Sequence, residues 1–143
     1  MEKKLKKISK KVNFFLNRYL SKFNSSELIK PMKYGLFPGG KKVRSKIIFD
    51  VGKIFKVKKK DLMILAASVE VIHAYSLIHD DLPCMDDDDL RRGKPSTHIK
   101  FGESTAILAG NSLLTTAFEI LSDKSFKVDD KIKSNLINLL SRC

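Results

Sequence analysis

The sequence predicts an all-α protein, and three observations carry this prediction. Only 7 glycines and 4 prolines occur in 143 residues, and 43% of the residues are hydrophobic. This composition is typical of globular, helix-rich chains. Apolar residues recur at helical spacing along most of the chain, and no stretch alternates between apolar and polar residues as a half-buried strand does. We find no internal repeat and expect no boundary between domains.

The helices follow from local patterns. Residues 1–23 carry apolar side chains at helical spacing with lysines between them, which predicts an amphipathic helix. Residues 62–78 are mostly apolar, which predicts a buried core helix capped by Asp61 and ended before Pro83. This stretch is short for a membrane span and contains Glu70 and His73. Further helices are expected after Ser25 and over residues 43–57, 104–121 and 128–140.

The formal net charge of +12 raises the question of a nucleic-acid partner. However, 23 of the 28 basic residues are lysines, scattered over the chain without clustered arginines and aromatics. We therefore expect a solvated lysine surface, no nucleic-acid partner and no stable membrane anchor, although the basic first helix leaves a membrane-surface role open. The two cysteines, Cys84 and Cys143, give no disulfide framework, and no signal peptide is visible, so we expect a reducing, cytoplasmic setting.

Residues 80–89 form the most unusual stretch, because six of these ten residues are aspartates and two arginines follow closely. Carboxylates this close repel one another unless cations neutralise them. An EF-hand starting at Asp86 would have Arg91 at its sixth position and Thr97 at its twelfth, which excludes that site. Mg²⁺ held by a few carboxylates and by substrate phosphates fits better, with Arg91, Arg92 and Lys94 near the remaining phosphate oxygens. The alternative is a solvated acidic loop neutralised by its own arginines.

A second candidate site lies in residues 35–42, which nearly match a phosphate-binding P-loop. Lys42 replaces the hydroxyl residue of that motif, and no strand precedes the loop. Glycine amides at a helix start, with Lys41 and Arg44 three residues apart on one helical face, still suit a diphosphate. The alternative is an ordinary turn with exposed cations. On the core helix, His73 shares a face with Ser76 and Asp80.

At these motifs the chain resembles the trans-isoprenyl diphosphate synthases, and most closely their bacterial farnesyl diphosphate synthase branch. The matching segments are residues 39–44, 72–86, 90–95, 101–103 and 106–111. The resemblance implies an all-α, antiparallel helical bundle of the isoprenoid synthase type and Mg²⁺ as cofactor. It also implies a prenyltransferase that joins dimethylallyl or geranyl diphosphate to isopentenyl diphosphate, giving farnesyl diphosphate. A geranylgeranyl diphosphate synthase, or a truncated non-catalytic partner, is the alternative.

The resemblance also implies roles for individual residues. Asp80, Asp81 and Asp86 would be catalytic, with Asp80 and Asp86 as the metal ligands. Arg91 would bind the allylic diphosphate, and Tyr75 and Ser76 would set product length. Isopentenyl diphosphate would be bound by Lys41, Arg44, His73 and Arg92.

In one respect the chain departs from this family. Its members are about twice this long and carry a second aspartate-rich motif with a nearby lysine, which is absent from these 143 residues. We therefore expect residues 1–143 to be the N-terminal half of a single domain, incomplete as a bundle and inactive alone. The full-length protein is expected to be a homodimer.

Overall fold

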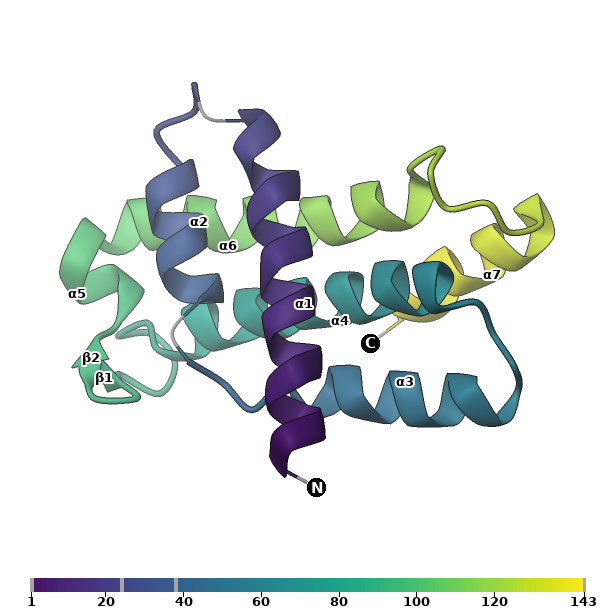
Figure 1. Cartoon of the computed structure of the whole chain (residues 1–143). Coiled ribbons are helices and arrows are strands. Elements are labelled where there is room, and N and C mark those ends of the chain that lie inside the picture. The colour runs from purple at the N-terminus through teal and green to yellow at the C-terminus, as the bar shows by residue number, and fades with distance from the viewer. Residues whose placement is uncertain (1, 24, 38, 143) are drawn as a thin grey trace.

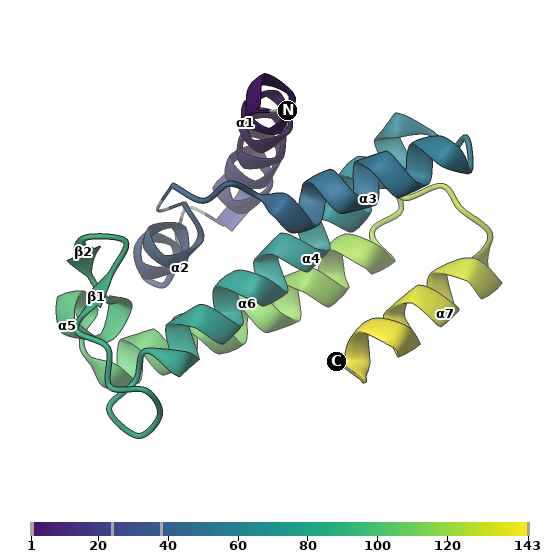
Figure 2. The ribbon, with the colours of Figure 1, turned by 90° about the horizontal axis from the view of Figure 1, so that it is seen from below.

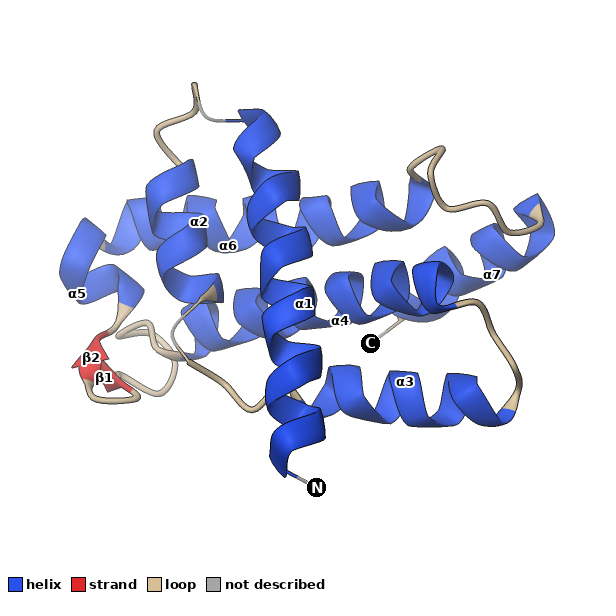
Figure 3. Cartoon of the chain, viewed as in Figure 1, coloured by secondary structure: helices blue, strands red, loops and turns tan. Residues whose placement is uncertain are grey.

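The computed structural model describes residues 2–23, 25–37 and 39–142. Within them the fold is all-α, as predicted, apart from one pair of two-residue antiparallel strands, β1 (Leu90–Arg91) and β2 (Lys94–Pro95) (Figure 3). A 3₁₀ turn, Ser21–Phe23, follows α1. The α-helices are α1 (Glu2–Leu20), α2 (Ile29–Leu36), α3 (Val43–Ile54), α4 (Lys59–Asp80), α5 (Thr97–Phe101), α6 (Glu103–Ser122) and α7 (Asp130–Ser141) (Figure 1).

Helix α4 is the central element. It runs alongside α6 and α3 and antiparallel to both (Figures 1 and 2). Both helices carry small buried residues, such as Ala67 on α4 and Ala109 on α6, and Gly110 of α6 lies directly against His79 of α4. The hydroxyl of Ser68 donates to the carbonyl oxygen of Ala117 across the α4–α6 contact at 2.9 Å. This packing explains why the sequence of α4 is apolar on most of its circumference.

The first two helices lie across this layer (Figure 1). Val12, Leu16 and Leu20 of α1 are fully buried, while the lysines in the N-terminal half of the same helix are exposed. The predicted amphipathic helix is therefore confirmed, and its apolar stripe packs on the rest of the fold. In the described part of the chain, α4 is the one helix long and apolar enough to cross a membrane, and half of that stretch is buried inside the protein.

Several predicted boundaries are wrong in detail. Asp61 does not cap α4, because the helix begins at Lys59 and Asp61 lies buried in its first turn. A carboxylate there still interacts favourably with the helix dipole. Helix α3 ends at Ile54, three residues early, and neither α5 nor the strand pair was predicted. That residues 1–143 form half of one domain stays a prediction.

Candidate functional site

The aspartate-rich loop folds back onto the C-terminal end of α4. The amide of Asp86 donates to the carbonyl oxygen of Asp80 at 2.8 Å, and the amide of Asp88 donates to that of Asp81 at 3.2 Å. These bonds use carbonyl groups that a helix end leaves without partners. Between them residues 82–85 form a turn, closed by the amide of Met85 on the carbonyl oxygen of Leu82 at 2.9 Å. Aspartates six or seven residues apart therefore gather at one helix end.

Asp81 differs from its neighbours because it is buried and already paired. Its side chain is 3% exposed, and its oxygens accept from Nε of Arg91 at 2.7 and 2.8 Å and from Nη2 of the same residue. This pairing raises the pKa of Arg91, mainly through the hydrogen bond to Asp81. Asp81, which was predicted to be catalytic, therefore already has a cation as its partner. Only the Nε and Nη2 atoms of Arg91 take part in the bonds to Asp81 and Asp88, and Nη1 does not.

Asp80 and Asp86 are more accessible, with Asp80 half-buried and Asp86 exposed. They lie at the negative end of the α4 dipole, where further carboxylates are unfavourable without a cation. In the described ranges, no three histidine, cysteine or acidic side chains converge as a ready-made metal site. Two accessible carboxylates fit Mg²⁺, which takes oxygen ligands and completes its shell with water and phosphate. The donor set therefore suits the predicted ion.

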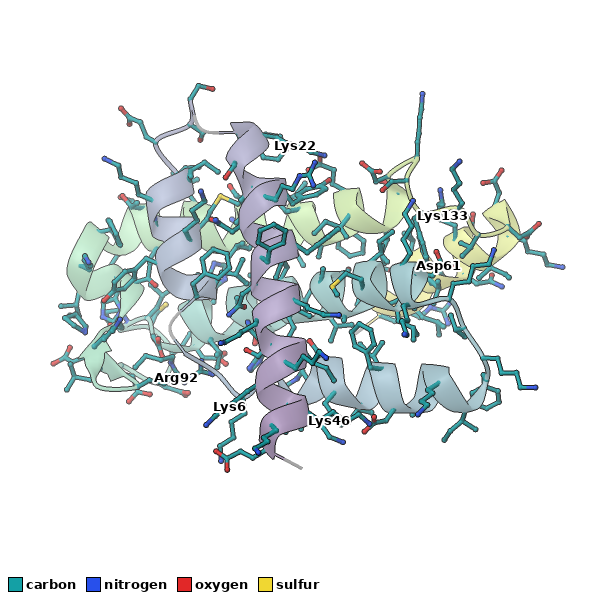
Figure 4. The ribbon with its side chains drawn as sticks, viewed as in Figure 1. Lys6, Lys22, Lys46, Asp61, Arg92 and Lys133 are labelled. Carbon is teal, nitrogen blue, oxygen red and sulfur yellow. The ribbon has the colours of Figure 1, made fainter. Side chains whose placement is uncertain are left out.

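The four residues predicted to bind isopentenyl diphosphate line one pocket of about 420 Å³. They come from the α2–α3 loop, α3, α4 and the turn between the two strands, and are Lys41, Arg44, His73 and Arg92. Arg92 lies at the strand end of the molecule, away from Asp61 at the start of α4 (Figure 4). Lys41 precedes α3, so it does not share a helical face with Arg44 as predicted, but both contribute to the pocket.

Gly40 allows the loop and the strand turn to meet. A Cβ atom at this position would lie 2.6 Å from Nη1 of Arg92, which is closer than real contacts allow. The absence of a side chain thus lets the guanidinium group pack directly on the loop. This glycine brings together two basic segments that are about 50 residues apart in the sequence.

His73 is half-buried beside three cations. Burial lowers its pKa first, and Arg44 then lowers it further, as do Lys42 and Arg92 more weakly, while Glu70 opposes them. A lowered pKa keeps the imidazole neutral at pH 7, so that it offers one donor and one acceptor rather than a further charge.

Sequence reasoning missed two members of this pocket, Lys42 and Glu70. The Glu70 side chain is 2% exposed and the Lys42 side chain 8% exposed, and the two form an ion pair at 3.4 Å. The available signal was a carboxylate in the middle of an apolar helix, three residues before His73. Such a group needs a partner, and the basic loop before α3 supplies it.

The two predicted chain-length residues lie between the pocket and the aspartates on α4. Tyr75 is half-buried against the core, and its ring meets the ring of His79 edge-on at 4.7 Å between centroids. The Ser76 hydroxyl donates to the carbonyl oxygen of His73 at 3.1 Å, within its own helix. Their predicted role stays a prediction.

Comparison with known proteins identifies the family. A family model described as polyprenyl synthetase matches residues 25–143. The chain belongs to the polyprenyl synthetase family. Farnesyl diphosphate synthase from Buchnera aphidicola (subsp. Acyrthosiphon pisum) is 50% identical over 117 residues, which cover 82% of this chain and 41% of that protein. The Escherichia coli farnesyl diphosphate synthase is 47% identical over 135 residues, which cover 92% and 45% of the two chains.

Solved structures of this family share the fold. The apo structure of an FPP/GFPP synthase from Zymomonas mobilis superposes with a TM-score of 0.85 at 35% identity, covering 99% of this chain and 53% of that one. The all-α isoprenoid synthase fold is therefore confirmed. The chain spans less than half the length of the two farnesyl diphosphate synthases, so the activity of a whole enzyme is a matter for proposal.

Proposed function

We propose that this chain provides the diphosphate-binding part of a prenyltransferase. The enzyme would condense dimethylallyl or geranyl diphosphate with isopentenyl diphosphate to give farnesyl diphosphate. The observation that carries the proposal is the single pocket lined by the four predicted isopentenyl diphosphate residues, on the helix that ends in the aspartates. Several donors converging on one small pocket suit a diphosphate, since charge-assisted hydrogen bonds to phosphate are strong.

The two ends of the reaction fall to different residues. Lys41, Arg44 and Arg92 would hold the isopentenyl diphosphate, with neutral His73 as a further hydrogen-bonding group. Arg91 would meet the allylic diphosphate through the guanidinium nitrogen that Asp81 does not use. Asp80 and Asp86 would hold Mg²⁺, which when bound supplies positive charge to the leaving diphosphate.

Each condensation makes one carbon–carbon bond, so geranyl diphosphate gives farnesyl diphosphate in one condensation and dimethylallyl diphosphate gives it in two. The carbon–oxygen bond of the allylic substrate breaks, and its electron pair leaves with diphosphate. The double bond of isopentenyl diphosphate attacks the allylic cation, and a proton of the product cation passes to the departing diphosphate. The apolar side chains of α4 contain no nucleophile, so they would not react with the allylic cation before the double bond of isopentenyl diphosphate does.

Two substitutions in an active enzyme that contains this chain test the assignment. Asp80→Asn should lower kcat by about 100-fold or more, with the affinity for isopentenyl diphosphate nearly unchanged, because the carboxylate acts on charge that develops in the transition state. Arg92→Ala should instead raise KM for isopentenyl diphosphate by about tenfold, the loss of one charge-assisted contact. Lys53→Ala, an exposed cation on α3, is the matched control. If Asp80→Asn raised KM for isopentenyl diphosphate and Arg92→Ala lowered kcat instead, the assignment of the two subsites would be wrong.

Two alternatives remain distinct. A geranylgeranyl diphosphate synthase would differ in product length, which chromatography of the products measures. A non-catalytic partner would bind diphosphates and give no product when a complete enzyme is assembled from it. Retention of both sets of phosphate-binding residues supports descent from an active enzyme.

The setting and assembly of the protein are also proposed. A reducing, cytoplasmic location is supported by Cys84, which is exposed and free. Cys143 lies outside the described residues. Homodimerisation of the complete protein follows from the family resemblance, and sedimentation of the full-length protein tests it.

A further inference from the structure

Glu70 makes contacts to the start of another helix. Its Oε1 atom accepts from the amide of Ser45 at 3.1 Å and from the Ser45 hydroxyl at 2.7 Å. Its Oε2 atom pairs with the ammonium group of Lys42 at 3.4 Å. Ser45 is fully buried, so all of these contacts are shielded from water. The Glu70 carboxylate of α4 therefore contacts both Lys42, which precedes α3, and Ser45 in the first turn of α3.

Helix α3 needs this carboxylate because its own sequence does not cap it. The N-cap position is Lys42, which makes no side-chain cap hydrogen bond. The Ser45 amide belongs to the first turn of α3, whose amides have no partner within the helix. Glu70 fills the place of a cap from a different helix, and its negative charge lies at the positive end of the α3 dipole.

The Lys42 side chain is held inward by two other helices, α2 and α4. Its backbone is left-handed, with φ of 50°, which is unfavourable for a residue with a Cβ atom. Its ammonium group contacts Glu70 and also donates to the carbonyl oxygen of Leu36, the last residue of α2, at 3.3 Å. Lys42 therefore links the end of α2, the start of α3 and the middle of α4.

The residues that flank this link face the pocket. Lys41 and Arg44 are exposed and line it, whereas Lys42 and Ser45 are turned to Glu70. Glu70 is the one carboxylate among the described residues lining that pocket, and Lys42 neutralises it. The same contacts thus fix the loop and prevent an unpaired negative charge from opposing a bound diphosphate.

We propose that Glu70 is a positioning residue for the isopentenyl diphosphate subsite, acting through Lys42 and Ser45 on the loop that carries Lys41 and Arg44. This inference rests on the proposed function of that pocket. It also assigns Lys42 to the protein rather than to the substrate, although its neighbour Lys41 has the same side chain.

Binding of isopentenyl diphosphate and of an allylic diphosphate to the chain, measured by calorimetry, tests the proposal. Glu70→Gln keeps the size of the side chain but removes the ion pair. It should lower the affinity for isopentenyl diphosphate about tenfold, which is the loss expected for one charge-assisted interaction. The affinity for the allylic diphosphate should fall less than about twofold. Asp61→Asn, which removes another buried carboxylate of α4, is the matched control and should change neither affinity.

A second set of variants keeps the test decisive if Glu70→Gln folds poorly. Lys42→Arg retains the ion pair and should bind isopentenyl diphosphate as the wild type does, whereas Lys42→Met should weaken it as Glu70→Gln does. The positioning role would be overturned if Glu70→Gln lowered the affinities for both diphosphates equally. It would also be overturned if Lys42→Met bound isopentenyl diphosphate as tightly as the wild type or more tightly. Failure of the wild-type chain to bind isopentenyl diphosphate, with Arg92→Ala indistinguishable from it, would instead overturn the proposed function and this inference with it.

Discussion

His73 shows how a pocket built from cations controls one residue. Because burial and Arg44 lower its pKa, the folded chain keeps His73 neutral at a pH where the unfolded chain protonates it. As the pH falls below about 6.5, the unfolded state therefore takes up a proton first, and the free energy of unfolding decreases. The full contribution of His73 to the free energy of unfolding returns when the pH rises well above about 6.5.

The same residue should couple diphosphate binding to proton uptake. A bound diphosphate offsets the cations around His73 and raises its pKa, so binding near pH 6 should take up as much as about one proton. Calorimetry with inorganic diphosphate in buffers of different ionisation enthalpy measures this number. His73→Gln keeps hydrogen-bonding capacity without titrating and should reduce the uptake to that of diphosphate itself. If wild type and His73→Gln took up the same number of protons, His73 would not be the group that titrates on diphosphate binding.

At the scale of elements, the contact between α4 and α6 depends on one glycine. A Cβ atom on Gly110 would lie 2.5 Å from Cδ2 of His79, closer than two non-bonded carbon atoms can approach. The same ring makes a hydrogen bond with the carbonyl oxygen of Ile107 on α6 at 3.2 Å. The imidazole next to Asp80 is thus held against α6, and the end of α4 that carries the aspartates is held with it.

Gly110→Ala should consequently destabilise the chain. Alanine in place of glycine inside a helix ordinarily stabilises by up to about 1 kcal/mol, but overlap with His79 should cost about 1–3 kcal/mol. Urea unfolding gives the sign directly. Asn111→Ala on the exposed side of α6 is the control and should be close to neutral. The double variant Gly110→Ala/His79→Ala should recover part of the loss, since the overlapping ring is removed.

The long helices, the aspartate-rich loop and the basic loop before α3 were predictable, because periodicity and charge are local properties of the sequence. The short elements were not. The strand pair closes through Arg92 at φ of 55° and Gly93 at φ of 75°, and only the glycine signals such a turn. Nothing local distinguishes Lys42 from Lys41 either. Their opposite orientations follow from a carboxylate 28 residues further along the chain, on a helix that the loop meets only after folding.

On the scale of the whole molecule, charge is strongly separated. Six of the 16 acidic residues lie in residues 80–89, while lysines cover α1 and the corner between α3 and α4. In the proposed enzyme, the positive surroundings would attract diphosphates, and the acidic loop would attract the cation that accompanies them. The +12 charge is therefore compatible with small anionic substrates without a nucleic-acid partner.

In the proposed enzyme, product length would depend on how far the substrate extends along α4 from the aspartates. Tyr75 lies five residues before Asp80, about 7.5 Å along the helix axis. A chain anchored by its diphosphate at the aspartates and extending along α4 would meet an aromatic ring at that depth. The ring packs edge-on to His79 and against the core, so it is supported in place. It would therefore act as a floor for a fifteen-carbon product.

Tyr75→Ala in an active enzyme containing this chain should accordingly shift the product from fifteen carbons to twenty or longer. The substitution leaves the hydrogen bond between His79 and the Ile107 carbonyl oxygen in place, so the α4–α6 contact should survive. Tyr75→Phe retains the bulk of the ring and should keep the fifteen-carbon product. Ser76→Ala removes a hydroxyl that bonds within its own helix, and its product shows whether Ser76 takes part in setting the length. Chromatography of the products decides the matter. An unchanged product from a folded Tyr75→Ala enzyme would show that the ring is only part of the core, and a long product from Ser76→Ala would transfer the floor to the neighbouring position.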